Sequence, residues 1–195
     1  VRWRVFVVAI RSDVVHDWSF PAPTHSEAAL HYDQATGEYW ERHGIRPRDG
    51  FAPSSLTLPD DRLPWVTIRD AIADLPKPID KVEHPEVLHH VGWPGAREYP
   101  GHTPNDLDRP AKTVKAGVHG VPGGESVLRL DDGSIRYMTV REVARVMTFP
   151  DDWRFVGPRG EQMRQLGNAV PVRLGRVVAD SLVQAIWKRS ARGRR

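Results

Sequence analysis

The sequence has no cysteine, and this absence excludes three kinds of chemistry from its 195 residues. Without a thiol there is no disulfide framework, no zinc site with thiolate ligands and no cysteine nucleophile. The sequence also lacks any apolar run near the roughly 18 residues that a membrane-spanning helix needs, and its start shows no signal-peptide pattern. We therefore expect a protein that has no membrane partner and works in the cytoplasm.

An excess of charge of one sign is also missing, because 28 Lys and Arg residues stand against 25 Asp and Glu residues. The cations are nevertheless mostly arginine, and the isoelectric point is about 9.4. The planar guanidinium group suits phosphates and guanine edges, so nucleic acid is a candidate partner. A proteome that is generally rich in arginine would give the same composition, so composition alone leaves both interpretations open.

The first recognisable element is a continuous apolar run at residues 5–10, rich in β-branched side chains. Such a run predicts a strand that is buried on both faces, as in the middle of a parallel sheet. Arg2 and Arg4 precede it at alternate positions and should point the same way. No βαβ repeat surrounds this run, so we expect its neighbouring strands in a segment outside these residues or in a second chain.

The long middle of the chain, residues 14–108, is predicted to be rich in loops because Pro, Gly, His and Asp recur without sustained periodicity. Its clearest helix spans residues 67–75. Thr67 and Asp70 have the spacing of a capping box at the start of this helix, and Pro76 ends it.

A basic and then glycine-rich stretch follows at residues 109–124. Its glycines allow the backbone to lie close against a partner, and its Lys, Thr and His side chains can donate hydrogen bonds to phosphates or base edges. A flexible surface loop is the alternative interpretation. Residues 127–130 and 135–138 then flank Asp131-Asp132-Gly133-Ser134, which predicts a β-hairpin.

The last part of the chain is predicted to be helical. Thr139 and Glu142 form a capping-box pattern that opens a helix at residues 140–148, and a short helix is expected at residues 160–166. Gly167-Asn168-Ala169-Val170-Pro171 is interpreted as a polar turn before a long apolar helix, because proline suits the first turn of a helix. The apolar face of that helix has helical spacing and comprises Leu174, Val177, Val178, Ser181, Leu182, Ala185 and Ile186.

These segments, taken in order, resemble the C-terminal half of the DNA (cytosine-5) methyltransferases. The family's eighth motif resembles Arg2 and Arg4 with residues 5–11, and its ninth motif resembles Arg109-Pro110-Ala111-Lys112-Thr113-Val114. The helix at residues 139–145, followed by Phe149-Pro150-Asp151, is similar to the element after the family's recognition region. The tenth motif resembles Gln165-Leu166-Gly167-Asn168-Ala169-Val170-Pro171.

The resemblance implies an α/β fold: part of a Rossmann-like domain that depends on S-adenosylmethionine, plus a small, loop-rich, mostly β target-recognition domain. The expected divisions are a strand of the catalytic domain (1–13), the target-recognition domain (14–138), a hinge helix with the return to the catalytic domain (139–190) and a basic tail (191–195). A solvated terminus is the more ordinary explanation of the tail.

The resemblance also implies roles for individual residues. Arg4, with Arg2 beside it, would support the negative charge that develops on a cytosine ring, although both could instead form surface ion pairs. S-adenosylmethionine would contact the tenth motif, and double-stranded DNA would contact the ninth motif and the loop after it. The expected cofactor-binding residues are Asn168, Ala169 and Val170, and the expected DNA-binding residues are Arg109, Thr113, Lys115, Gly117 and His119.

The family's catalytic cysteine and its glycine-rich cofactor loop are missing from this sequence. The resemblance therefore implies a dependence on the N-terminal catalytic half, in the same longer chain or in a separate subunit, within a bacterial cytoplasm and its nucleoid. A catalytically inactive DNA-binding remnant is the alternative. A metal enzyme is a further alternative, because of five histidines: His84, His89, His90, His102 and His119. Their spacing does not match that of paired metal ligands.

Overall fold

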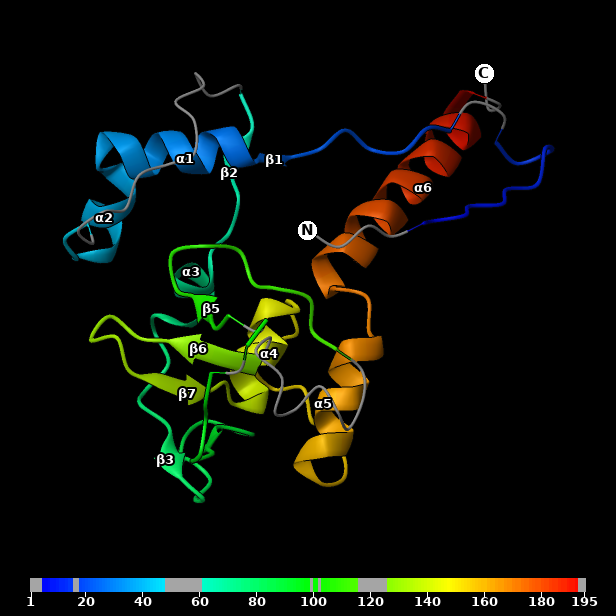
Figure 1. Cartoon of the computed structure of the whole chain (residues 1–195). Helices are drawn as coiled ribbons and strands as arrows, with labels where there is room; N and C mark the ends of the chain where they lie inside the picture. The colour runs from blue at the N-terminus through cyan, green and yellow to red at the C-terminus, as the bar shows by residue number, and fades with distance from the viewer. Residues whose placement is uncertain are drawn as a thin grey trace.

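The computed structural model describes residues 5–15, 18–47, 61–98, 100–101, 103–115 and 126–192. Its elements form two packed bodies and one long projecting helix (Figure 1). In chain order the elements are β1 (His25–Ser26), α1 (Glu27–Thr36), α2 (Glu38–His43), β2 (Leu63–Pro64), α3 (Ile68–Ile72), β3 (Ile79–Asp80), β4 (Val91–Gly92), β5 (Asn105–Asp106), β6 (Val127–Arg129), β7 (Ile135–Tyr137), α4 (Val140–Val146), α5 (Arg159–Asn168) and α6 (Val172–Arg192).

The strands pair in three small sheets. β1 pairs with β2 and β3 with β4, both in parallel, while β5 and β7 flank β6. The β6–β7 pair is the antiparallel hairpin predicted from the Asp-Asp-Gly-Ser turn, with Leu128 opposite Arg136. β5 adds to this hairpin in parallel, so Asn105 lies opposite Leu128.

The main hydrophobic core lies between the hairpin and helices α3, α4 and α5. Ile68, Leu128, Val143 and Leu166 represent these four elements and are almost completely buried. A second, smaller cluster of Leu30, Tyr39 and Trp40 joins α1 to α2. The two cores correspond to the two bodies in Figure 1.

Both predicted capping boxes are confirmed. Thr67 accepts a hydrogen bond from the backbone N–H of Asp70 while the Asp70 carboxylate accepts one from the backbone N–H of Thr67. Thr139 and Glu142 make the same reciprocal pair at the start of α4. These local contacts satisfy N–H groups that a helix start otherwise leaves unpaired.

The strand predicted at residues 5–10 is not formed within the described part of this chain, and the expectation that its neighbours lie outside these residues stays a prediction. The segment is extended, but no described strand pairs with it, and the side chains of Val5 and Val7 are 90% and 88% exposed. A strand buried on two faces needs hydrogen-bonded neighbours and two covering layers. The described residues supply no pairing strand and cover only one side, where Phe6 lines a pocket together with Leu174 and Val177 of α6.

Residues 14–138 are rich in loops, as predicted, but they are less β than predicted. Helices α1 and α2 lie in a region where no helix was expected, and more of the described residues in 14–138 are helical than are in strands. Ser26 caps α1 by accepting a hydrogen bond from the backbone N–H of Ala29 at 3.1 Å, and Gly37 and Gly44 end the two helices at φ of 97° and 63°. Each helix buries only a narrow stripe, so its apolar periodicity is weak.

The predicted turn at Gly167 and Asn168 is also corrected, because α5 continues through Asn168. The backbone N–H of Ala169 donates to the carbonyls of Gln165 and Leu166 and closes the helix there. Gly167 is buried. The bend between α5 and α6 therefore comes at Ala169, Val170 and Pro171.

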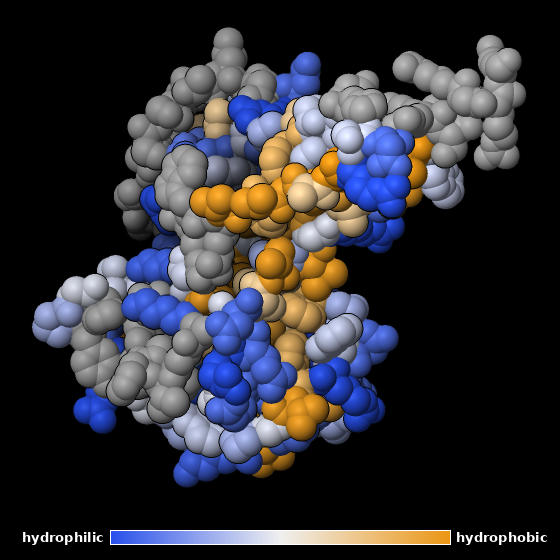
Figure 2. Space-filling view, turned by 90° about the vertical axis from the view of Figure 1, so that its right-hand side faces the viewer, coloured by the Kyte–Doolittle hydropathy of each residue, from blue (hydrophilic) through white to orange (hydrophobic). Residues whose placement is uncertain are grey.

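Helix α6 follows Pro171, as predicted, but its apolar face is only partly covered. Leu174, Val177 and Ile186 are each exposed by about two fifths. Figure 2 faces the side of the molecule that carries α5 and α6, and it shows a band of hydrophobic surface there. None of the helices in the described part of the chain is both long enough and apolar enough to cross a membrane.

Lowering the pH below about 6.5 is expected to destabilise the fold through His89. Its Nε2 atom accepts a hydrogen bond from the backbone N–H of Phe155 at 3.0 Å, which only the neutral ring can do. Burial, followed by the charge of Arg141, lowers the pKa of His89. The unfolded chain therefore binds a proton that the folded chain does not, and the free energy of unfolding falls as the pH drops from about 6.5 toward the lowered pKa.

Urea unfolding at a series of pH values tests this expectation. The variant His89→Asn should lose this part of the pH dependence, and asparagine tolerates the φ of 62° at this position. The variant His31→Asn on α1 is the control and should retain it. An unchanged slope in His89→Asn would contradict the assignment.

Candidate functional site

The segment at residues 109–115 is held to the hairpin by the side chain of Asn105. The buried Asn105 amide donates from Nδ2 to the carbonyl of Val127 at 3.0 Å, and its Oδ1 accepts from the backbone N–H of Lys112 at 2.9 Å. One amide thus bridges β6 and the middle of the segment. Sequence reasoning missed Asn105, and no periodicity or motif around it distinguishes it.

The side chains of the 109–115 segment alternate between core and surface. Ala111 and Val114 pack against the main core, whereas Arg109, Lys112 and Lys115 are exposed and Thr113 is half-buried. The Lys112 ammonium donates to the carbonyl of Thr103 at 2.6 Å. The core contacts fix which side chains face out, and those are cations together with one hydroxyl.

The second group of predicted site residues lies at the α5–α6 corner, which we define as Asn168, Ala169 and Val170. Asn168 is exposed and Val170 is 51% exposed, while Leu166, two residues before Asn168, is completely buried. The corner therefore presents one amide and one branched apolar side chain on a rigid base.

The start of α6 is fixed to the end of α4. The backbone N–H of Val172 donates to the carbonyl of Met147 at 3.1 Å, and that of Arg173 donates to Thr148 Oγ1 at 2.9 Å. Thr148 has a φ of 59°, a conformation that is rare for a β-branched residue. Sequence reasoning missed this contact, which sets the position of the α5–α6 corner.

One open groove of about 440 Å³ lies between the 109–115 segment and the start of α6, and no residue of the α5–α6 corner lines it. Its lining includes Pro110 and Ala111 from the 109–115 segment, Arg145 and Val146 from α4, and Arg173 from α6. Asn168, Arg109 and Thr113 do not line it. The other expected site residues, Arg2, Arg4, Gly117 and His119, lie outside the described residues.

The described histidines of the metal-enzyme alternative make ordinary structural contacts. His90 is completely buried, with Nδ1 at 2.9 Å from Thr139 Oγ1 and Nε2 at 2.8 Å from the carbonyl of Pro76. His102 and His119 lie outside the described residues. Among the residues that are described, no group of three His, Cys, Asp or Glu side chains is arranged to hold a metal ion.

Arg145, on the wall of the groove, pairs with two carboxylates near the ends of α3 and α4. Arg145 donates to the Asp151 carboxylate at 2.9 and 2.7 Å and also pairs with Asp74. The hydrogen bonds from Arg145 lower the pKa of Asp151. These carboxylates keep Arg145 in one orientation on the groove wall.

Comparison with known proteins places these segments in one protein family. The family model described as C-5 cytosine-specific DNA methylase matches residues 1–184. The chain therefore belongs to the C-5 cytosine-specific DNA methylase family, a family of methyltransferases that methylate DNA. The mixed α/β structure with small sheets is consistent with a domain of such an enzyme.

Curated relatives include Type II methyltransferases from several bacteria. The chain is 28% identical to M.SacI of Streptomyces achromogenes, and the alignment covers 99% of this chain and 50% of that protein. It is 30% identical to M.NgoFVII of Neisseria gonorrhoeae over 87% of this chain and 42% of that protein, and 34% identical to M.AplI of Arthrospira platensis over 65% and 38%. The chain thus spans half or less of the length of these relatives.

Proposed function

We propose that this chain is the target-recognition and cofactor-pocket-closing part of a DNA (cytosine-5) methyltransferase. The family match over residues 1–184 supports this proposal, together with the absence of any cysteine from the sequence. The family's attacking thiolate has to come from outside these residues, in the same longer chain or in a partner subunit. The proposed setting is the bacterial cytoplasm, at the nucleoid.

The proposed arrangement assigns residues 1–13 and 139–190 to a Rossmann-like catalytic domain that is completed elsewhere, and residues 14–138 to the target-recognition domain. The unpaired extended segment at residues 5–10 and the half-covered face of α6 support this division. Both carry apolar side chains in water, and burial of such surface is the main favourable term in association. The missing catalytic half is the proposed occupant of this face.

The target base lies inside the duplex, so it has to be flipped out at a cost of a few kcal/mol. Contacts to the surrounding phosphates hold the distorted backbone in place. In our proposal Arg109, Thr113 and Lys115 make such contacts, because the 109–115 segment directs exposed cations and a hydroxyl away from the core. We also assign contacts with DNA to Gly117 and His119.

Negative charge develops on the flipped cytosine ring during methyl transfer, and donors placed at that charge lower the barrier. We assign Arg4 to the O2 side of the ring, with Arg2 supporting it. Neither residue acts as a nucleophile. Their contribution is to hold a fixed positive charge where the ring becomes negative.

S-adenosylmethionine, when bound, supplies the methyl group. The α5–α6 corner fits one side of such a ligand, since Val170 offers an apolar contact and the Asn168 amide offers both donors and acceptors. Ala169 between them carries no bulky side chain. Buried Leu166 and the bonds from α6 to α4 keep this corner in place before the ligand arrives.

The test is complementation with a fragment that carries the family's cysteine and glycine-rich loop. Mixing the two chains with S-adenosylmethionine and duplex DNA should give 5-methylcytosine, and neither chain alone should do so. The inactive-remnant alternative predicts DNA binding without methyl transfer from the mixture. That result, obtained with two folded chains that bind each other, would overturn the proposed enzymatic role.

Removing the Thr113 hydroxyl is expected to weaken DNA binding without changing cofactor binding. In the complete enzyme, Thr113→Val should reduce DNA affinity about three- to tenfold, which corresponds to the net contribution of about 1 kcal/mol of a typical hydrogen bond. Fluorescence of a 2-aminopurine at the target position should report less flipping. Thr113→Ser should restore both, and Thr36→Val at the end of α1 is the control. Equal losses in the two valine variants would contradict the role.

A further inference from the structure

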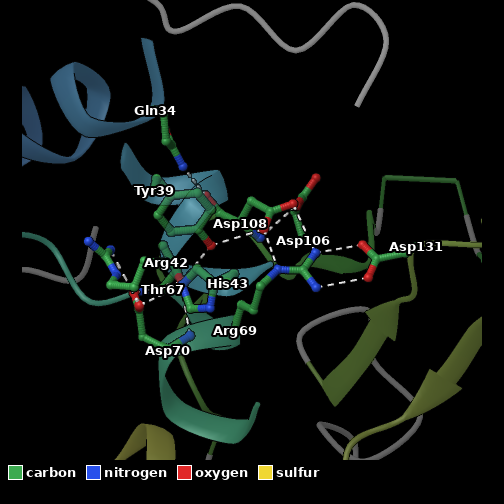
Figure 3. Close-up of polar contacts among 10 residues, drawn as sticks. All are labelled: Gln34, Tyr39, Arg42, His43, Thr67, Arg69, Asp70, Asp106, Asp108 and Asp131. Carbon is green, nitrogen blue, oxygen red and sulfur yellow. Dashed lines mark hydrogen bonds and ion pairs between the residues drawn. The ribbon is translucent and has the colours of Figure 1, made fainter. Parts of the chain in front are cut away.

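A buried ion pair lies directly before the 109–115 segment. The Asp108 carboxylate is completely buried and accepts hydrogen bonds from Arg69 Nε at 2.6 Å and Arg69 Nη2 at 3.2 Å. It also accepts one from the Tyr39 hydroxyl at 2.9 Å (Figure 3). Burial raises the pKa of Tyr39, so this hydroxyl stays protonated and able to donate. Asp108 thus connects α2, α3 and the start of the segment.

The backbone around Asp108 is fixed as firmly as its side chain. The first two N–H groups of α3 donate to the carbonyls on either side of Asp108. Arg69 N donates to the carbonyl of Leu107 at 2.8 Å, and Ile68 N donates to the carbonyl of Arg109 at 3.1 Å. The Gln34 amide of α1 donates to the Asp108 carbonyl at 2.7 Å. Three consecutive carbonyls are therefore held by two helices, immediately before the residues proposed to contact phosphates.

The other side of the Arg69 guanidinium extends the network to the hairpin. Arg69 Nη1 and Nη2 donate to the Asp131 carboxylate at 2.8 and 2.5 Å (Figure 3). Asp131 belongs to the turn between β6 and β7. Arg69 therefore ties the start of the 109–115 segment to the hairpin that follows the glycine-rich stretch.

An ion pair of this kind is a poor source of net stability. Taking Arg69 and Asp108 out of water costs about as much as their attraction returns, and apolar replacements of similar volume are often neutral. What the pair does provide is fixed geometry, because the guanidinium fork and the carboxylate fit in one bidentate orientation. The network is thus better suited to placing a segment than to strengthening the core.

We propose that Asp108, Arg69 and Asp131 form a positioning network. It holds the 109–115 segment and the β6–β7 hairpin in the relative position that DNA binding requires. These residues act through Arg109 and Thr113 and do not themselves touch DNA. The inference rests on the proposed function, since it assumes that the segment contacts phosphates.

The variants Asp108→Asn and Asp131→Asn in the complete enzyme test the network. Each keeps the shape of the side chain and removes its charge. Asp151→Asn is the matched control, because Asp131 and Asp151 both receive two hydrogen bonds from one arginine and their side chains are 52% and 54% exposed. The partly exposed Asp131 also gives a variant that folds if Asp108→Asn does not.

We expect about a tenfold loss of DNA affinity for Asp108→Asn and about a threefold loss for Asp131→Asn, since misplaced contacts lose binding steeply. The slope of the logarithm of DNA affinity against the logarithm of salt concentration should become shallower by the amount expected for about one phosphate contact. Affinity for S-adenosylmethionine should stay unchanged in both variants. A network with a purely structural role predicts a different result. The affinities for DNA and for S-adenosylmethionine would then fall together, and no change would be confined to the salt dependence of DNA binding.

Three outcomes overturn the inference: the two variants match Asp151→Asn, their salt dependence equals that of the wild type, or DNA and cofactor affinities fall equally. Failure of the proposed function looks different. In that case the wild-type enzyme itself does not bind DNA, or Thr113→Val leaves binding unchanged. If Thr113→Val weakens binding and Asp108→Asn does not, the positioning network alone is rejected.

Discussion

Replacing Arg141 with methionine is expected to lower the free energy of unfolding by about 3 to 5 kcal/mol, which is a large part of the stability of an ordinary domain. The Arg141 side chain has no exposed surface. It donates to the backbone carbonyls of Leu88, Pro150 and Trp153 at 2.9, 3.0 and 3.0 Å. Methionine keeps most of the apolar stem and supplies no donor. The carbonyls of Leu88 and Trp153 would lose this donor, whereas that of Pro150 keeps the backbone N–H of Trp153 at 3.1 Å. A carbonyl left without a partner costs about 1 to 3 kcal/mol.

Urea unfolding of Arg141→Met and Arg164→Met measures this difference. Arg164 has a side chain that is 52% exposed, and its partner Glu161 is on the same helix. Its loss should change the free energy of unfolding by about 0.5 kcal/mol or less. If both variants lose the same small amount, the three carbonyls have other partners and Arg141 does not organise these loops.

The second large effect is expected at the proposed ring contact. Arg4→Ala in the complete enzyme should reduce turnover about 100- to 1000-fold, because a fixed charge opposite a developing charge acts mainly in the transition state. DNA affinity should fall much less. Arg4→Lys should restore little of the turnover, since an ammonium group lacks the planar fork of arginine.

The control for this prediction is Arg11→Ala, at the other end of the apolar run. The Arg11 side chain is 79% exposed and pairs with Asp13. Turnover at saturating DNA and the DNA dissociation constant are measured on the same preparations. Equal losses of turnover and affinity in Arg4→Ala would count against its role at the cytosine ring.

Local signals in the sequence predicted several elements correctly. The capping boxes at Thr67 and Thr139 join residues three positions apart, and the hairpin turn joins strands separated by five residues. Such contacts depend on spacing and side-chain chemistry alone. The failure at α1 and α2 has a related cause, because a short helix with a narrow buried stripe gives little periodicity even when Ser26, Gly37 and Gly44 mark its ends.

The strand predicted at residues 5–10 is a different case, because the described part of this chain does not form it. Its apolar composition describes what the segment requires, namely neighbours on both sides. Those neighbours are not among the residues that the structure describes. Composition can therefore indicate that a segment requires burial, but it cannot indicate which polypeptide segment buries it.

The sequence by itself determined the family, the order of its motifs and the impossibility of a thiol nucleophile in these residues, because each depends only on which residues are present and in what order. The tertiary structure decided how the candidate site is held. Asp108 and Arg69 are 39 positions apart, Asn105 reaches Val127 across 22, and Thr148 meets the start of α6 across 25. No periodicity connects such pairs, since they meet only where the chain folds back on itself.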